Sequence, residues 1–393
     1  MMVVAMSVSL AAGCGSASSS ESAKTPSSEE SSETQSFESS GSTSDSESDT
    51  SGVTLASSSD IDSSTEKSFI QQISEAFSEN YGDSDKYTGT DSEATSASAV
   101  GMEKLPDDYL NDEKVNYAEH QGTIEQIDYQ RELTTASGDA LYCTANVYLP
   151  YGYDENEQYD IIYLMHGMGG DQNTFLGNAV MEGGIKVILD NMIEEGKIPP
   201  VIVVAPGLEE SGDVDLANQV IWELIDSIAN YLMPLVETQY STYAETADEA
   251  GFIASRDHRC FGGFSMGGCA TWQMLWYYPG YFRYYIPNSM IADFRLDADV
   301  EGTTEKMVNS ITEKGYSMDD FEIYCGVGTE DYTNFMVSKQ IDALLEYSDL
   351  FKDTEEDGFD SGNLMYRKWS GRYHRFYESF PYFYNALQLF FGE

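Results

Sequence analysis

Hydrophobic and polar positions follow two regular patterns in the chain after about residue 119. Two stretches alternate apolar and polar residues and predict strands with one buried face, whereas shorter continuous apolar runs predict strands buried on both faces. Segments with apolar residues at helical spacing lie between most of these runs. The predicted strands are 122–131, 141–149, 161–165, 201–205, 260–264, 284–287, 321–327 and 364–369, and the predicted helices are 176–195, 215–237, 267–278, 303–315, 333–348 and 379–391.

This alternation of strands and helices is typical of an α/β protein. Parallel strands need crossover connections, so the helices are expected on both faces of a mostly parallel central sheet. In such sheets the loops at the carboxyl ends of the strands meet along one edge and carry the functional groups. The sequence therefore predicts one α/β domain over residues 116–393, with its site at that edge.

The part of the chain before this domain has a different composition. Residues 15–115 are rich in Ser, Thr, Asp and Glu and contain few large apolar side chains. Such a segment cannot bury enough apolar surface to offset the entropy of ordering. We therefore predict a disordered linker over 15–115, in which the run 69–77 forms no more than a transient turn of helix.

Residues 1–14 are small and apolar and end in Leu10-Ala11-Ala12-Gly13-Cys14. This end is similar to a bacterial lipoprotein signal, in which cleavage leaves a lipidated cysteine, here Cys14, at the N-terminus. The run lacks a preceding Lys or Arg and has Ala11 where Leu is usual, so a truncated ordinary signal peptide or a chance apolar N-terminus is the alternative. We expect an extracellular protein, anchored to the outer face of a bacterial cell membrane through this lipid alone.

Charge and cysteine spacing exclude two classes of function. The formal net charge of −48 at pH 7 repels phosphate backbones, so we expect no nucleic-acid partner, although solubility alone would also account for the charge. A neutral polysaccharide or a small ester is compatible with it. The spacing of the remaining cysteines fits no zinc site, and we expect free, buried thiols at Cys143, Cys260, Cys269 and Cys325.

The segment Gly263-Phe264-Ser265-Met266-Gly267 has the G-x-S-x-G pattern of a nucleophile elbow. It lies between a predicted strand and a predicted helix, which is the context that the motif requires. Side chains two positions from a serine at so tight a bend would collide, and glycine at 263 and 267 removes that clash. The pattern predicts a serine hydrolase with Ser265 as its nucleophile, and an ordinary turn is the alternative.

A serine hydroxyl needs a base within hydrogen-bond reach, and histidine is the usual one because its pKa lies near 7. We expect His120 on the surface, His258 in solvent at the far end of the strand before Ser265, and His166 in a loop suited to presenting backbone N–H groups. His374 remains, on the loop after the last predicted strand. Its place also fits the chain order of nucleophile, acid and histidine in α/β-hydrolases.

The carboxylate that orients the histidine is expected between Ser265 and His374, at the end of a strand. Asp331 follows the strand 321–327, and its neighbour Glu330 is the alternative; either acid would also suit the start of a helix. The tetrahedral intermediate needs two hydrogen-bond donors as well. We expect the backbone N–H groups of Met266, directly after the nucleophile, and of Met168, in the loop after 161–165.

Together these motifs closely resemble the carbohydrate esterase family 1 type, the esterases that include bacterial feruloyl esterases and acetylxylan esterases and are relatives of esterase D and the mycolyltransferases. The resemblance covers about residues 118–393 and rests on 147–153, 163–170, 190–198, 263–268 and 328–331. The family's Gly-Thr-x-Asp acid matches Asp331, and its Gly-x-x-His histidine followed by aromatic residues matches His374. The resemblance implies an α/β-hydrolase fold without a large lid and no cofactor.

The resemblance also implies a serine carboxylic-ester hydrolase that removes feruloyl or acetyl groups from plant cell-wall polysaccharide such as xylan. Acyl transfer to a sugar, thioester hydrolysis of the esterase D type and a non-catalytic carbohydrate-binding surface module are the alternatives. Aromatic and basic residues surround His374 and would suit a ferulate ring or a sugar face, or would pack the last helix. They are Trp369, Arg372, Tyr373, Arg375, Phe376, Tyr377 and Phe380. The sequence predicts neither the acyl group nor the oligomeric state.

Overall fold

The computed structural model describes residues 104–106, 109–110, 116–134, 140–178, 183–207, 218–294, 298–354 and 358–392. The chain divides into two compact units, Met1–Thr65 and Glu66–Glu393, and every described residue belongs to the second. The predicted signal segment with Cys14 lies outside the described residues, as does nearly all of the predicted linker. No helix in the described ranges combines the length and the apolar character needed to cross a membrane.

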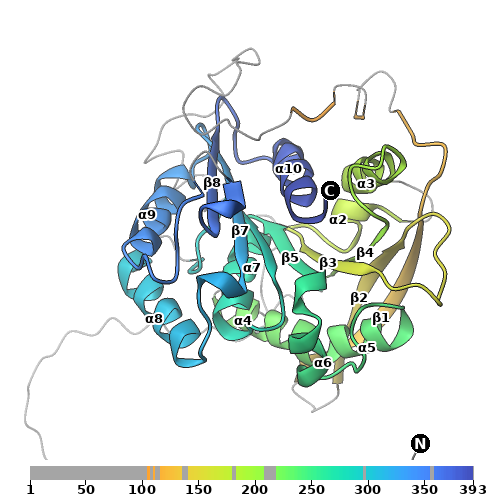
Figure 1. Ribbon diagram of the computed structural model, residues 1–393, viewed down its shortest axis with the longest axis horizontal. Helices are drawn as coiled ribbons and strands as arrows, with labels where there is room; N and C mark the ends of the chain where they lie inside the picture. Colours follow the sequence, from red (N-terminus) through yellow and green to blue (C-terminus); the bar gives the residue numbers. More distant parts are fainter. Residues whose placement is uncertain are drawn as a thin grey trace, which may run out of the picture. The chain divides into compact units, whose positions relative to one another are not determined.

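In the described part of the chain, eight strands form one sheet in the order β1-β2-β4-β3-β5-β6-β7-β8 (Figure 1). β1 pairs antiparallel with β2, and β2 pairs antiparallel with β4, whereas the pairs β4-β3, β3-β5, β5-β6, β6-β7 and β7-β8 are parallel. The predicted mostly parallel sheet is confirmed, and each predicted strand is present. The strands are β1 (Thr123–Thr134), β2 (Ala140–Leu149), β3 (Asp160–Met165), β4 (Val201–Pro206), β5 (Arg259–Phe264), β6 (Tyr284–Asn288), β7 (Glu322–Gly328) and β8 (Leu364–Trp369).

Two apolar cores lie on opposite faces of the sheet, which explains why its central strands are continuous apolar runs. Side chains of a strand point alternately to either face. In β3, Ile161, Tyr163 and Met165 join one core and Ile162 and Leu164 the other. Every residue of β4 and β5 is buried. Because both faces are covered, these strands show no alternation of apolar and polar positions; the charged residues Asp160 and Arg259 stand only at the first position of β3 and of β5.

Helices cover both faces of the sheet, as predicted (Figure 1). The first core is closed by α4, α5, α6, α7, α8 and α9, and the second by α2, α3 and α10. The helices are α2 (Asn173–Leu176), α3 (Gly184–Glu194), α4 (Asn218–Ser227), α5 (Met233–Gln239), α6 (Glu249–Ala254), α7 (Met266–Tyr277), α8 (Val300–Glu313), α9 (Asn334–Leu345) and α10 (Phe380–Phe391).

One helix prediction needs correction, and one helix was not predicted. The predicted helix 176–195 begins only at Gly184, because the short α2 ends at Leu176 and is followed by Gly177, whose φ of 71° favours glycine and breaks the helical path. The helix α6 was not predicted, since its six residues are too few for a clear apolar period. Its signal was the acidic residue at its start: the side chain of Asp248 accepts a hydrogen bond from the Gly251 N–H at 3.0 Å.

The thiols and the acidic side chains of the described residues form no metal site. Cys143, Cys260, Cys269 and Cys325 are buried thiols outside any disulfide bond, as predicted. Burial raises the pKa of the Cys260 and Cys325 thiols, so they remain uncharged at neutral pH. Among the described residues, no three His, Cys, Asp or Glu side chains are grouped to hold a metal ion.

Candidate active site

The turn between β5 and α7 holds Ser265 in a strained backbone conformation. Ser265 has φ 58° and ψ −119°, in a region that residues with a side chain rarely adopt. Its N–H donates to the Asn288 carbonyl at the end of the neighbouring strand β6, at 3.0 Å, and its carbonyl accepts from the Cys269 N–H at 3.0 Å. Hydrogen bonds on both sides of the residue therefore maintain the sharp turn that the elbow motif predicted.

Close backbone approach explains both glycines of the elbow. A Cβ atom at position 263 would overlap the backbone of Gly267, and a Cβ atom at 267 would overlap the carbonyl oxygen of Met165 in β3. The sequence predicted a clash around the turn; the structure shows in addition that the neighbouring strand contributes to it. These glycines let the elbow lie directly against the end of β3.

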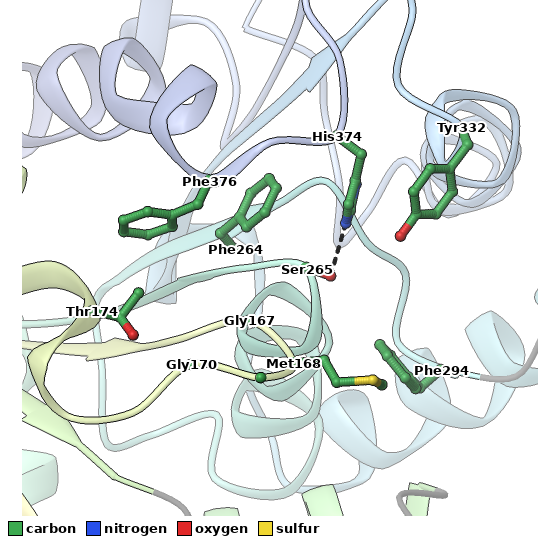
Figure 2. A pocket seen from close by; sticks show the side chains of 11 residues that line it. Gly167, Met168, Gly170, Thr174, Phe264, Ser265, Phe294, Tyr332, His374 and Phe376 are labelled. Atoms are coloured by element: carbon green, nitrogen blue, oxygen red, sulfur yellow. Dashed lines mark hydrogen bonds between the residues drawn. The ribbon is translucent and has the colours of Figure 1, made fainter. Parts of the chain in front are cut away.

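Ser265, His374 and Asp331 form a chain of hydrogen bonds at the carboxyl edge of the parallel strands. The Oγ atom of Ser265 lies 2.9 Å from Nε2 of His374 (Figure 2). On the other side of the ring, Nδ1 lies 2.9 Å from Oδ1 and 3.0 Å from Oδ2 of Asp331. Ser265 follows β5, Asp331 follows β7 and His374 follows β8, so the fold brings together side chains up to 109 positions apart in the sequence.

The surroundings of Asp331 keep its carboxyl group ionised. Burial opposes the charge, but the adjacent His374 and the hydrogen bonds from Thr333 hold the pKa of Asp331 below its usual value. The N–H and the hydroxyl of Thr333 donate to Oδ1 at 2.8 and 2.6 Å. A carboxylate only accepts, so Nδ1 of His374 carries the proton. Nε2 is then left as the acceptor for the Ser265 hydroxyl, which is the arrangement a general base requires.

The neighbouring acid Glu330 lies elsewhere. Its side chain is exposed and accepts from the Thr329 hydroxyl at 3.4 Å, and its N–H donates to the Arg372 carbonyl. Consecutive residues in this loop direct their side chains to opposite sides, one into the protein and one into solvent. Of the two acids that the sequence left open, Asp331 is the one in contact with His374.

A cavity of about 490 Å³ opens beside the Ser265 hydroxyl. Its wall is mostly apolar, and loop 167–170 lies along it close to the serine (Figure 2). A Cβ atom at Gly167 would lie 3.4 Å from Cβ of Ser265. Met266 begins α7, where backbone N–H groups have no partner within the helix. The predicted oxyanion donors, Met266 and Met168, thus both lie next to the serine. The lining residues are Gly167, Met168, Gly169, Gly170, Thr174, Phe264, Ser265, Phe294, Tyr332, His374 and Phe376.

Several cavity residues were not identified from the sequence. The ring of Tyr332 lies 4.2 Å from that of His374 between centroids, and the ring of Phe264 lies 4.8 Å from it on the other side. Burial, followed by the charge of Asp331, raises the pKa of Tyr332, so its hydroxyl stays protonated. Tyr332 follows the predicted acid and Phe294 lies after β6, but neither stands in a motif. Only the spatial proximity of the loops reveals them.

The sequence left two roles open for the aromatic and basic residues around His374, namely contact with the substrate and packing of the last helix. Phe376 lines the cavity, whereas Trp369 and Phe380 are buried in the second core. Tyr377 is 56% exposed and turns away into solvent. Arg375 lies over the ring of Tyr373 and 3.4 Å from a Glu378 oxygen. Core packing therefore accounts for some of these residues and the cavity wall for one of them.

The other three histidines do not contact Ser265. His120 is half exposed, with Nδ1 3.6 Å from Glu194. His258 is 41% exposed, stacks on Tyr243 and lies 2.7 Å from Asp160. His166, in contrast, is almost completely buried beneath the loop 167–170, with 2% of its surface exposed. Within the described residues, His374 alone satisfies the geometry of a base for Ser265.

Comparison with known proteins agrees with this site. The family model named Esterase matches residues 142–388. The chain is 33% identical over 298 residues to endo-1,4-beta-xylanase Y of Acetivibrio thermocellus, and the aligned region covers 75% of this chain and 25% of that protein. It is 30% identical over 171 residues to an endo-1,4-beta-xylanase/feruloyl esterase of Xylanibacter ruminicola, and this aligned region covers 42% of this chain and 21% of that protein. The chain thus spans about a quarter or less of the length of these relatives.

A solved structure covers the domain more completely. The feruloyl esterase module of Clostridium thermocellum, in a serine-to-alanine mutant complexed with sinapinate, is 30% identical. The match covers 77% of this chain and 96% of that module, with a TM-score of 0.61. The sheet order, the elbow and the hydrogen-bonded serine fit the α/β-hydrolase fold. The chain belongs to the esterase family, and its folded domain is a serine carboxylic-ester hydrolase of the carbohydrate esterase family 1 type.

Proposed function

We propose that the protein is a serine esterase that removes feruloyl groups, or acetyl groups, from a plant cell-wall polysaccharide such as xylan. The observation that carries this proposal is the hydrogen-bonded chain from Ser265 through His374 to Asp331, which opens onto an apolar cavity. The names of the similar proteins, a xylanase, a xylanase/feruloyl esterase and a feruloyl esterase module, support the substrate class.

The first half-reaction forms an acyl-enzyme. The Oγ atom of Ser265 attacks the ester carbonyl carbon while its proton moves to Nε2 of His374, and the carbonyl oxygen becomes an oxyanion. The N–H groups of Met266 and Met168 stabilise that oxyanion in our proposal. The intermediate then collapses, the ester C–O bond breaks, and Nε2 gives the proton to the departing sugar oxygen. Asp331 remains ionised and stabilises the charged imidazole.

The second half-reaction releases the acid. A water molecule takes the place of the sugar hydroxyl, His374 accepts its proton, and the hydroxide oxygen attacks the acyl carbon of the acyl-enzyme. Collapse of the second tetrahedral intermediate breaks the bond to Oγ, and the proton returns to Ser265. No cofactor is needed, because His374 moves each proton and Ser265 carries the acyl group.

The size and lining of the cavity favour an aromatic acyl group. Its volume of about 490 Å³ lies within the range of roughly 300–1,000 Å³ that is usual for small-molecule sites. Phe264, Phe376 and Phe294 present apolar surface and ring faces, against which a phenolic ring stacks well. An acetyl group would contact little of this wall. We therefore place feruloyl ahead of acetyl as the acyl group.

We also propose that the protein is exported and anchored through a lipid on Cys14, with residues 15–115 as a flexible linker that holds the esterase domain away from the membrane. The apolar sequence before Cys14 and the Ser- and acid-rich composition after it support this. Palmitate labelling of the wild type that is lost in Cys14→Ala would support the anchor. A wild type that takes up no palmitate would contradict it.

The function is tested by measuring the release of ferulate from methyl ferulate and of acetate from acetylated xylan in parallel. We expect ferulate release by the wild type and none by Ser265→Ala, which lacks the nucleophile but retains the fold. Acetate release alone would move the assignment to an acetylxylan esterase. Equal hydrolysis by Ser265→Ala would overturn the mechanism.

A further inference from the structure

His166 is a buried histidine that the proposed mechanism does not use. It directly follows β3, and its Nδ1 atom lies 2.7 Å from the carbonyl oxygen of Gly167. Because a carbonyl oxygen only accepts hydrogen bonds, Nδ1 carries the proton and donates it. Burial lowers the pKa of His166, so its ring is neutral at pH 7 and Nε2 is unprotonated.

The second ring nitrogen has no hydrogen-bond role within the described residues. Nε2 of His166 is buried, and no described side chain or backbone group donates to it. A buried nitrogen without a partner is uncommon, because it loses its hydrogen bond to water on folding. The ring of His166 thus serves as no proton relay to a described residue, and its Nδ1 hydrogen bond goes to Gly167.

The Gly167 carbonyl is held from two sides. Besides the His166 ring, the N–H of Gly170 donates to it at 3.1 Å and closes a four-residue turn. Gly169, the third residue of that turn, has φ 76°, the conformation that a type II turn requires at this position. Both donors thus approach the same oxygen and fix the direction of the C=O bond.

Fixing this carbonyl also fixes the N–H group of the next residue. The C=O of Gly167 and the N–H of Met168 belong to one planar trans peptide unit, in which the two bonds point in opposite directions. With the oxygen turned toward His166, the N–H of Met168 points to the other side of the loop. A Cβ atom added to Gly167 would lie in van der Waals range of Ser265 Cβ, and Figure 2 shows the loop beside the serine.

We propose that His166 is a positioning residue for the oxyanion hole, which holds the Gly167 carbonyl and thereby aims the Met168 N–H at the oxyanion beside Ser265. The inference rests on the proposed function, in which this N–H stabilises the tetrahedral intermediate. Gly170 fits the same role. A Cβ atom there would lie 3.0 Å from Nδ1 of His166 and 2.7 Å from the Thr174 hydroxyl, and would push the ring from the carbonyl.

The test compares His166→Leu, which removes the donor, with His166→Asn, whose amide nitrogen takes nearly the position of Nδ1. Stopped-flow acylation by p-nitrophenyl acetate gives the rate constant of the chemical step and the dissociation constant of the substrate separately. We expect His166→Leu to lower the acylation rate constant by about 10²-fold, the typical effect of misplacing a catalytic group by 1 Å. The substrate dissociation constant should stay unchanged, because the oxyanion exists only in the transition state.

His166→Asn should recover most of the lost rate, which a purely space-filling role would not allow. Phenylboronic acid, which forms a tetrahedral adduct with a reactive serine, should bind more weakly to His166→Leu by about the factor lost in acylation. If His166→Leu does not fold, His166→Gln replaces it, since its amide nitrogen reaches the Nε2 position instead; it should be slower than His166→Asn. Equal rates in Asn and Gln, or an unchanged rate in Leu, would overturn the proposal.

This readout is separate from the feruloyl proposal. The acylation burst depends on Ser265 but not on the chemistry of ferulate, so a protein that releases no ferulate still reports on His166. A burst that persists in Ser265→Ala would instead remove the assigned nucleophile and the proposed function with it.

Discussion

The contact between Asp331 and His374 gives the sharpest prediction for the proposed mechanism. In Asp331→Asn the two oxygens that face Nδ1 of His374, at 2.9 and 3.0 Å, become one oxygen and one NH₂ group, and the negative charge is lost. The shape of the side chain is nearly unchanged, and Thr333 can still donate to the remaining oxygen. The substitution therefore tests charge and proton position while it leaves the packing intact.

The magnitude follows from the electrostatics of the pair. Two unit charges about 4 Å apart attract each other by about 4 kcal/mol at an effective dielectric constant near 20, which applies to partly screened sites. Losing that attraction destabilises the charged imidazole in the transition state, and 4 kcal/mol corresponds to roughly a 10³-fold lower rate. An asparagine NH₂ group facing Nδ1 also favours the wrong histidine tautomer, which brings the expected loss to about 10⁴-fold.

The assay is steady-state hydrolysis of methyl ferulate, with KM and kcat determined separately at pH 7.5. We expect kcat of Asp331→Asn to fall by about 10³- to 10⁴-fold, with little change in KM. Glu330→Gln is the matched control, because Glu330 is an exposed neighbour in the same loop and does not contact His374. The reasoning is refuted if Asp331→Asn keeps activity within tenfold of the wild type, or if Glu330→Gln loses as much as Asp331→Asn.

Three further predictions concern stability. Gly267→Ala should destabilise the fold by several kcal/mol, because its Cβ overlaps the Met165 carbonyl; a melting temperature equal to the wild type would contradict this. Arg259→Met should cost about 3–5 kcal/mol in urea unfolding, since it leaves Glu237 buried without the cation that now binds both its oxygens at 2.9 and 2.7 Å. The double variant Arg259→Met/Glu237→Met should regain most of the lost stability. A double variant as unstable as Arg259→Met alone would refute this prediction. The pKa of Asp331 is lower in the folded than in the unfolded protein, so the unfolded state binds the proton more readily. The ionised Asp331 therefore stabilises the fold above the ordinary aspartate pKa of about 4, and this stabilisation is lost as the pH falls below that value. If the stability difference between the wild type and Asp331→Asn instead grew in acid, this pH dependence would be contradicted.

Much of the fold could be predicted from local sequence. The apolar runs of β3, β4 and β5 reflect burial of both faces of these strands. Any sheet that is buried on two sides requires such runs, so the sequence alone indicates them. The boundaries near glycine were less predictable. The helix expected over 176–195 starts at Gly184 because positive φ at Gly177 ends the helical path, and the spacing of apolar residues does not report a single dihedral angle.

For the site, the sequence by itself determined what is local. It predicts Ser265 as the nucleophile from the glycines of its turn, His374 as the base from elimination and chain order, and Asp331 as the acid from a family motif. The tertiary structure decided which groups touch: it placed Asp331 on the ring and Glu330 in solvent, brought Tyr332 and Phe294 to the cavity, and buried His166 against the Gly167 carbonyl. These contacts depend on how separate loops pack at one edge of the sheet, and packing between distant segments leaves no periodic signal in the chain.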